Sequence, residues 1–288
     1  RSKGIRYITW AELCIFDNNA PVVEFNQYGV WESVKNYVLS IEEEQKIHNF
    51  MHDWKNSKST RWIYYDNPIE NFITIGSMLN LRENSFKVAV FPNMICDSSI
   101  IGMHVGFDSI LDWIYTCIDY AFINSDIDLI IRCHPGEKLD LGFLSGNFSI
   151  SEHLLKKYGR LPASVKLIMP NSEISSYALL QMADISVTYT GTLALEAPFY
   201  GKLCVLAGKS NLRGKGFTVD LASKDEMLAL FDKRMPLRSP TAYEVELAYR
   251  YAYLYKLRMV ANPDFYDKKM REFNLISLKI LESEGHVF

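Results

Sequence analysis

The chain has 288 residues, of which 48% are hydrophobic and 23% charged, and its formal net charge is −3. This is the composition of a globular protein with room for one large domain or two smaller ones. The acidic balance excludes a nucleic-acid-binding surface spread over the whole molecule. No stretch reaches the ~18 apolar residues of a membrane-spanning helix.

The first 84 residues show no clean repeating pattern and indicate irregular α/β structure. Ser40 followed by Glu43 is typical of a capping box, which predicts a helix over residues 40–55. Asn67-Pro68 interrupts the chain, and a short helix or loop follows it. The five cysteines have no metal-ligand spacing, so we expect reduced core residues and no metal site.

From Phe86 onward, short apolar runs alternate with helical patterns. Strands are predicted at 87–92, 127–133, 165–169, 184–189 and 203–207, and helices at 108–123, 151–158, 172–182, 193–200 and 224–233. Apolar strands that alternate with helices indicate an α/β fold with a doubly wound parallel sheet, covered on both faces. Two closing helices are predicted, over 241–261 and beyond Pro263.

Polar residues gather where the predicted strands end. The groups are Pro92-Asn93 with Asp97, Arg132 with His134-Pro135-Gly136-Glu137, Tyr189 with Thr190-Gly191-Thr192, and Gly208-Lys209. The carboxyl ends of parallel strands meet along one edge, and such sheets bind ligands in the crevice there. We therefore expect these groups to line a single site.

His134 directly follows an apolar strand, and Pro135 fixes the backbone so that the imidazole points out of the strand end. It can bond a phosphate oxygen or act as an acid or base near neutral pH; capping the strand is the alternative. Arg132 and Glu137 are further site candidates, with an exposed ion pair as their alternative role. Asp97 is a candidate base or acceptor-binding residue, and a turn-forming Asp is its alternative.

Thr190-Gly191-Thr192 lies between a strand and a helix, where first-turn N–H groups are unpaired and the helix dipole favours an anion. The hydroxyls can bond a phosphate while Gly191 allows close approach of the backbone. Capping the helix is the alternative, and both roles can hold. Glu196, on an otherwise apolar helix, needs a partner such as a ribose diol; its alternative role is to complement the dipole.

Three cations, Lys209, Arg213 and Lys215, alternate with glycines in the loop after the last predicted strand. We predict a mobile cationic loop that closes over a diphosphate or a sugar carboxylate. A solvated surface loop is the alternative.

Three segments occur in an informative order and spacing: FPNMICDSS (91–99), IIRCHPGE (130–137) and YTGTLALEAPFYGKLCVLAGKSNLRGKGFT (189–218). Together they resemble the capsule-polysaccharide-synthesis glycosyltransferases and the related bacterial Kdo transferases. The resemblance implies a GT-B-like fold and transfer of a sugar from a nucleotide-activated donor, such as CMP-Kdo, to a surface or capsular glycan or glycolipid. It also implies that basic and backbone donors neutralise the leaving phosphate, without a bound metal or cofactor.

The resemblance also assigns roles to residues. It implies that His134 and the Thr190-Gly191-Thr192 turn hold the donor phosphate and that Glu196 lies near the nucleotide. The predicted donor-binding set is Arg132, His134, Pro135, Tyr189, Thr190, Gly191, Thr192, Glu196, Lys209, Arg213 and Lys215. The predicted catalytic set is Asp97, His134 and Glu137.

A full GT-B enzyme has two Rossmann-like domains, and the acceptor half usually carries the catalytic base. We expect residues 1–84 to form a partial acceptor-side region, 85–240 the nucleotide-sugar-binding domain, and 241–288 helices that pack back on the first region. Either the N-terminal domain is truncated, or the chain is the C-terminal part of a longer protein.

Three alternatives to this function stay open. A polyol-phosphate (teichoic-acid type) transferase moves a phosphate-linked group on a similar scaffold. A UDP-GlcNAc 2-epimerase-like enzyme usually shows an acidic pair where this chain has Leu195 before Glu196. The third is a nucleotide-binding fragment without activity. We expect a cytoplasmic location, or peripheral association with the inner face of the membrane, and no nucleic-acid partner.

Overall fold

The computed structural model describes residues 31–32, 35–55, 65, 67–97, 100–138 and 149–254. It also describes the backbone of four short strands, β1 (Thr9–Ala11), β2 (Val22–Glu24), β9 (Tyr266–Asp267) and β10 (Glu272–Phe273). β1 pairs with β2 and β9 with β10, both antiparallel. Cys14 and the helix predicted beyond Pro263 lie outside the described residues.

The chain divides into two compact units. One comprises Tyr64–Ala248, and the other comprises Arg1–Ile63 with Tyr249–Phe288. The predicted division at residues 84 and 240, and the roles given to those regions, stay predictions.

The unit Tyr64–Ala248 is built on a six-stranded sheet in the order β5-β4-β3-β6-β7-β8, and every neighbouring pair is parallel. The strands are β3 (Phe86–Phe91), β4 (Ile127–Arg132), β5 (Val165–Ile168), β6 (Ile185–Thr188), β7 (Val205–Leu206) and β8 (Val219–Asp220). The chain moves outward from β3 to β5 and then crosses to β6 on the other side of β3. This confirms the α/β class and the doubly wound parallel sheet, with the switch point between β3 and β6.

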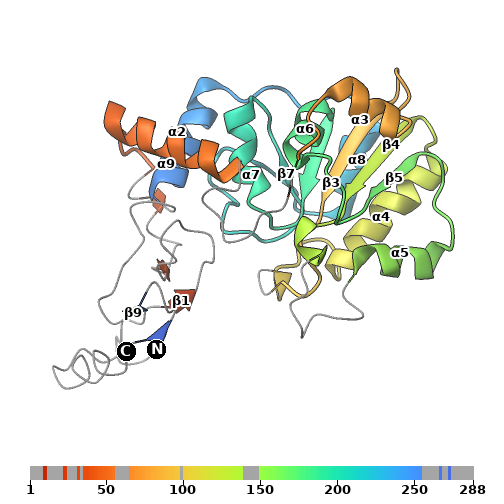
Figure 1. Cartoon of the computed structure of the whole chain (residues 1–288), viewed down its shortest axis with the longest axis horizontal. Coiled ribbons are helices and arrows are strands. Elements are labelled where there is room, and N and C mark those ends of the chain that lie inside the picture. The colour runs from red at the N-terminus through yellow and green to blue at the C-terminus, as the bar shows by residue number, and fades with distance from the viewer. Residues whose placement is uncertain are drawn as a thin grey trace. The chain divides into compact units, whose positions relative to one another are not determined.

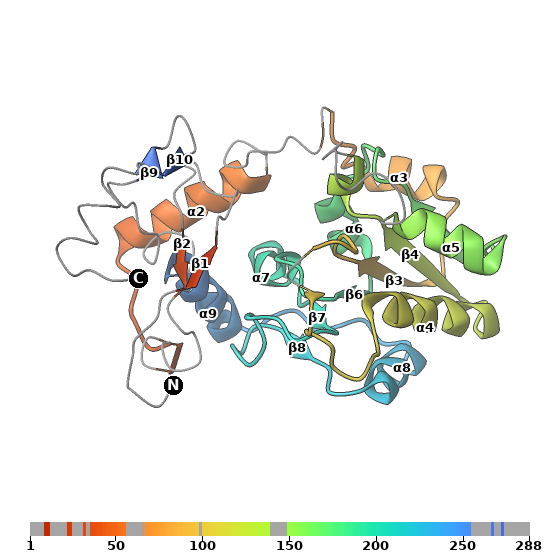
Figure 2. The same ribbon diagram turned by 90° about the horizontal axis from the view of Figure 1, so that it is seen from below.

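Helices cover both faces of this sheet (Figures 1 and 2). They are α3 (Phe72–Met78), α4 (Ile110–Ile123), α5 (Ile150–Tyr158), α6 (Ser176–Met182), α7 (Leu193–Glu196) and α8 (Lys224–Asp232). In Figure 2, α4 and α8 lie below the sheet and α3 and α6 above it. The fully buried Trp113 and Cys117 of α4 join Val88 and Val90 of β3 in the core between these layers.

Two predicted helices differ from the structure, one because of a distant backbone pairing and one because of a proline. The helix predicted from residue 172 begins at Ser176, because Ile174 forms a parallel bridge with Ile69 and keeps the preceding residues extended. The helix predicted over 193–200 is α7 followed by a 3-10 turn, η3 (Ala197–Tyr200), in which Pro198 lacks the N–H of a regular helix. The two-residue strand β8 was not predicted, because it has no apolar run.

In the second unit, the predicted capping box is confirmed at the start of α2 (Ile41–Lys55). The Glu43 amide donates to Oγ of Ser40 at 3.2 Å, and the Ser40 amide donates to Oε2 of Glu43 at 2.9 Å. At the end of α9 (Ala242–Tyr253), Nη1 of Arg250 donates to the Lys35 carbonyl at 2.6 Å. This bond joins the two chain segments of the unit.

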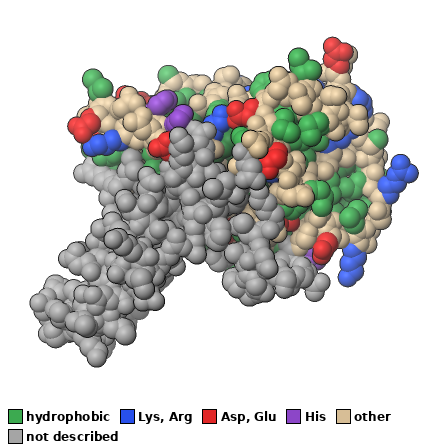
Figure 3. Space-filling view, in the orientation of Figure 1, with side chains coloured by type: hydrophobic (Ala, Val, Ile, Leu, Met, Phe, Trp, Pro, Cys, Tyr) green, Lys and Arg blue, Asp and Glu red, His purple; other side chains and the backbone are tan. Residues whose placement is uncertain are grey.

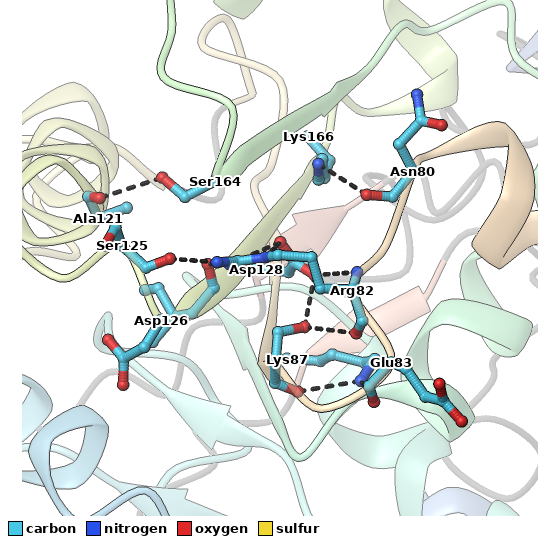
Figure 4. A network of polar contacts seen from close by, with 12 residues as sticks. Asn80, Arg82, Glu83, Lys87, Ala121, Ser125, Asp126, Asp128, Ser164 and Lys166 are labelled. Carbon is cyan, nitrogen blue, oxygen red and sulfur yellow. Dashed lines mark hydrogen bonds and ion pairs between the residues drawn. The ribbon is translucent and has the colours of Figure 1, made fainter.

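A polar network occupies the amino ends of β3 and β4 (Figure 4). Asp128 is fully buried and accepts from the Arg82 amide at 2.9 Å, from Nη2 of Arg82 at 2.9 Å and from Oγ of Ser85 at 2.5 Å. The same guanidinium donates to the carbonyls of Ser125 and Ile127. A buried carboxylate is tolerated when it is paired and hydrogen-bonded in this way.

The surface of the sheet unit carries isolated apolar side chains as well as charged ones. Ile73 on α3 and Ile123 at the end of α4 are each 84% exposed. Figure 3 shows hydrophobic side chains gathered on the right of the view, with basic side chains at the rim. The four described cysteines are free thiols, and three of them are buried, which agrees with the prediction of reduced core residues.

Candidate functional site

The carboxyl ends of three strands are joined by side chains at the switch point. Asn93, just after β3, accepts from the Thr190 amide at 3.1 Å and donates to Oδ2 of Asp97 at 3.3 Å. Oγ of Ser210, after β7, donates to the Thr190 carbonyl at 3.4 Å. Asn93 is 8% exposed; it belongs to a strand-end group predicted to line the site, but the sequence assigns it no role there. Its only signal in the sequence is its place directly after a strand and before Asp97.

The end of β4 lies against the same cluster. A β-carbon at Gly136 would lie 3.0 Å from Sδ of Met94 and 2.9 Å from Nδ1 of His134, so a larger residue here would displace these side chains. The charge of Asp97 also acts on the His134 ring. The structure thus brings together the predicted residues Asp97, His134 and Thr190.

His134 is a neutral hydrogen-bonding group in this setting. Burial lowers its pKa to about 4; the charge of Asp97 opposes this shift and that of Arg132 adds to it. The Gly136 amide donates to Nδ1 of His134 at 3.0 Å, so the proton of the neutral ring is on Nε2. At neutral pH the ring can donate through Nε2–H, but it carries no positive charge.

Glu137 lies in the 3-10 turn η2 (Pro135–Lys138) and faces the start of α5. Its Oε2 accepts from the Ile150 amide at 3.3 Å, while Oε1 is enclosed and has no partner in the described part of the chain. Burial raises the pKa of Glu137 to about 7, although the Ile150 and His134 backbone contacts lower it. A carboxyl group with this pKa is partly protonated at neutral pH, which suits acid–base chemistry.

Arg132 does not form the exposed ion pair with Glu137 that was the alternative role for both residues. It is 2% exposed, and Nη1 donates to the Cys133 and Met169 carbonyls at 3.1 and 2.6 Å. Nη2 donates to the Ser172 carbonyl at 3.0 Å. The guanidinium therefore links the loop after β5 to the end of β4.

Only some of the backbone amides at the Thr190-Gly191-Thr192 turn are unpaired. The Thr190 amide is bonded to Asn93, and the Gly191 amide donates to Oγ1 of Thr188 at 3.3 Å. Within the described residues, the amides of Thr192 and Leu193 donate to no acceptor. Thr192 stands at the cap position of α7, but its side chain makes no cap bond. The expectation of unpaired amides therefore holds for Thr192 and Leu193, next to a hydroxyl that makes no competing bond.

Tyr189 lies beneath this turn and is fully buried. Its hydroxyl is 2.6 Å from Nδ1 of His104, and its ring centroid is 5.3 Å from that of Trp113. Burial raises the pKa of Tyr189 to about 12. Its carbonyl accepts from the Gly208 amide at 2.8 Å, so the residue joins the ends of β6 and β7.

Glu196, at the end of α7, has a hydrogen-bond partner within the protein. Its side chain is buried, at 5% exposure, and Oε2 accepts from the Tyr177 hydroxyl at 2.7 Å. Tyr177 comes from α6, so the bond joins two helices on one side of the sheet.

The three cations of the loop after β7 have different surroundings. Lys209 is exposed, and its amide donates to the Met103 carbonyl at 2.8 Å. Arg213 turns inward, where Nη2 donates to the Leu221 carbonyl and Nη1 is enclosed without a partner among the described residues. Lys215 is half-buried.

Asp220, the last residue of β8, restrains this loop through hydrogen bonds. Its carboxylate accepts from the Gly214 amide and from Oγ1 of Thr218, both at 2.7 Å. These bonds restrain the loop that the sequence predicts to be mobile, and Asp220 was not recognised in the sequence. Closure of the loop over a ligand stays a prediction.

Metal-ligating side chains are not clustered in the described part of the chain: no group of three or more His, Cys, Asp or Glu there could hold a metal ion. None of the described helices is long and apolar enough to cross a membrane.

No family model matches the chain. No curated protein matches it either. Several solved structures do. A β-Kdo 2,4 transferase, KpsC of Thermosulfurimonas dismutans, is 14% identical, with a TM-score of 0.47 over 80% of this chain and 64% of that one. The KpsC β-Kdo 2,7 transferase of the same organism is 16% identical, with a TM-score of 0.44 over 90% and 73%.

A UDP-GlcNAc 2-epimerase from Neisseria meningitidis is also similar. It is 15% identical, with a TM-score of 0.37 over 65% of this chain and 48% of that one. The chain thus spans about two thirds of the first of these structures and about half of the third. These values give no basis for transferring a substrate or a residue role to this chain.

Proposed function

We propose that this chain is the donor-binding part of a GT-B glycosyltransferase of the capsule-polysaccharide-synthesis type. The donor is a nucleotide-activated sugar, CMP-Kdo or a related one, and the acceptor is a surface or capsular glycan or glycolipid. One observation carries the proposal. Asn93 fixes the Thr190-Gly191-Thr192 turn at the switch point of a parallel sheet, with two unpaired amides beside it.

The donor phosphate fits the groups gathered at this point. The Thr192 and Leu193 amides and the Thr192 hydroxyl can donate to its oxygens, and Nε2–H of His134 can donate from the end of β4. Because α7 has only four residues, the bonds themselves matter more here than the helix dipole. Lys209 extends from the end of β7 and adds a positive charge. Such donors can stabilise a leaving phosphate without a metal ion.

The nucleoside fits next to the phosphate, with Glu196 as the contact to the ribose. Glu137 is the acid–base candidate with a pKa matched to neutral pH, and Asp97 is the second carboxylate at this edge. The cytoplasmic location, and peripheral association with the membrane, stay predictions.

The test is a thermal-shift panel of CMP-, UDP- and GDP-sugars. We expect one nucleotide class to raise the melting temperature of the wild type. The rise should be lost in His134→Ala and Thr192→Ala, each compared with its own ligand-free sample. His52→Ala, an exposed histidine on α2, is the matched control and should keep the full response. If no nucleotide stabilises the wild type, the donor-site proposal is wrong.

Adding CDP-glycerol and a turnover assay to the panel separates two of the alternatives. A response to CDP-glycerol in preference to any nucleotide sugar would favour a polyol-phosphate transferase. Binding without turnover on added glycan acceptors would favour a nucleotide-binding part that lacks activity by itself.

A further inference from the structure

The carboxylate of Glu196 is buried but only partly satisfied. Its neighbours on the helix are Leu195 and Ala197, both buried, and the side chain itself is 5% exposed. A buried carboxylate needs hydrogen bonds, and its two oxygens can accept about four. Oε2 accepts from Tyr177, whereas Oε1 accepts from no residue that the structure describes. The carboxylate therefore has capacity for donors from a ligand.

Tyr177 can only act as a donor to this carboxylate. Burial raises its pKa well above the usual range, and the charge of Glu196 raises it further, so the hydroxyl keeps its proton at every physiological pH. Its ring centroid is 5.1 Å from that of Tyr200, which holds the ring in place. The bond to Oε2, at 2.7 Å, thus fixes the rotation of the Glu196 carboxylate.

The position of Glu196 along the chain matches the dimensions of a nucleotide. It follows Thr192 by one turn of helix, which is a rise of about 6 Å. That is comparable with the separation between the 5′-phosphate of a nucleotide and its ribose hydroxyls. The 2′- and 3′-hydroxyls form a cis-diol with two O–H donors, which complements one carboxylate oriented in advance.

We propose that Tyr177 is a positioning residue that holds Glu196 for the ribose cis-diol and so makes the donor site selective for ribonucleotides. This inference rests on the proposed donor site. Tyr177 does not touch the nucleotide in this arrangement. It removes the rotational freedom of Glu196, which the diol would otherwise have to restrict on binding.

The test compares CMP, UDP and GDP with their 2′,3′-dideoxy counterparts by calorimetry. The wild type should bind one ribonucleotide about 10- to 100-fold more tightly than its dideoxy form, as expected for hydrogen bonds to a charged group. Tyr177→Phe should reduce this ratio at least about threefold and leave the affinity for the dideoxy form unchanged. Glu196→Gln, which keeps the size of the side chain, should bring the ratio close to one.

The matched control is Tyr158→Phe, because Tyr158 donates to Oδ1 of Asp119 at the same 2.7 Å but lies on α5. It should keep the wild-type ratio. A Tyr177→Phe protein with the full ratio would overturn the positioning role. Equal affinity of the wild type for both nucleotide forms would overturn the contact between Glu196 and the diol. If the wild type binds neither form, the donor site itself is wrong, and the inference fails with it.

Discussion

The two edges of the parallel sheet differ in how completely their polar groups are hydrogen-bonded. At the amino edge, the buried Asp128 receives donors on both oxygens, and Arg82 extends the network to two backbone carbonyls. At the carboxyl edge, Asn93 satisfies the Thr190 amide, but the Thr192 and Leu193 amides have no acceptor in the described structure. A saturated network stabilises the fold, while unpaired donors at a rigid turn are available to a ligand.

The largest expected effect is at the amino edge. Asp128→Ala should lower the free energy of unfolding by about 2–4 kcal/mol, because the Arg82 amide, Nη2 of Arg82 and Oγ of Ser85 each lose a bond to a charged acceptor. Urea denaturation measures this loss. Asp126→Ala removes an ion pair with Arg234 at the same edge, but Asp126 is 65% exposed, so the loss should be at most about 1 kcal/mol. Similar losses for both variants would contradict the contrast between the two edges.

Next in size is the pH dependence that Glu137 gives to the carboxyl edge. Its pKa in the folded protein, about 7, exceeds the ordinary value of 4.5 for a glutamic acid side chain. The folded state therefore binds the proton more tightly. The stabilisation is fully present below pH 4.5 and is lost as the pH rises through 7, with a total on the order of 1–3 kcal/mol.

Glu137→Gln should remove this share of the pH dependence, as measured by unfolding between pH 4.5 and 8. Asp225→Asn, which changes an exposed acid on α8, is the control and should keep the wild-type slope. A wild-type slope in Glu137→Gln would show that this carboxyl group titrates normally.

A smaller effect is expected at the junction of β3 and β6. Asn93→Ala should weaken nucleotide binding about 10-fold, which corresponds to about 1.4 kcal/mol, because the Thr190 turn loses its anchor. Calorimetry gives the affinity, and denaturation should show a stability loss of about 1 kcal/mol. Asn171→Ala, an exposed asparagine in the loop after β5, should change neither. Unchanged affinity in Asn93→Ala would show that the Thr190 turn does not contribute to nucleotide binding.

The smallest effect concerns one hydroxyl. Thr192→Val keeps the shape of the side chain and removes a group that makes no cap bond, so the melting temperature should stay within about 1 °C. Affinity for the nucleotide should fall about 3- to 10-fold. Thr218→Val should lower the melting temperature and leave the affinity for the nucleotide unchanged, since that hydroxyl is bonded to Asp220. A loss of stability without a loss of affinity in Thr192→Val would show that the Thr192 hydroxyl stabilises the fold and does not bind the nucleotide.

The sequence predicts the elements of the sheet unit well, because their signals are local. Apolar runs locate β3 to β7, and the helix predicted over 108–123 begins within two residues of the start of α4. The same signals fail at α6, where the pairing of Ile69 with Ile174 decides where the helix begins. The convergence of Asp97, His134 and Thr190 follows from the parallel sheet, which is why it could be foreseen.

Side-chain partners could not be predicted in this way. The bond from the Thr190 amide to Asn93 spans 97 residues of sequence, and no local pattern indicates it. The sequence shows that Glu196 needs a partner, but the choice of Tyr177 depends on how α6 packs against α7. The inward turn of Arg213 depends on the Leu221 carbonyl, whose position is set by the pairing of β8 with β7. The ligand roles of all these residues stay predictions.

The charges near the loop after β7 have a consequence for how a ligand reaches the site. Lys209, Arg213 and Lys215 are positive, but the carboxylates of Asp97 and Asp220 lie at the same edge and His134 is neutral, so the excess of positive charge is small. An anionic nucleotide is then guided mainly by short-range hydrogen bonds, and long-range attraction contributes little. Association should therefore depend only weakly on ionic strength, so the protein would capture its donor almost as fast in concentrated salt as in dilute buffer.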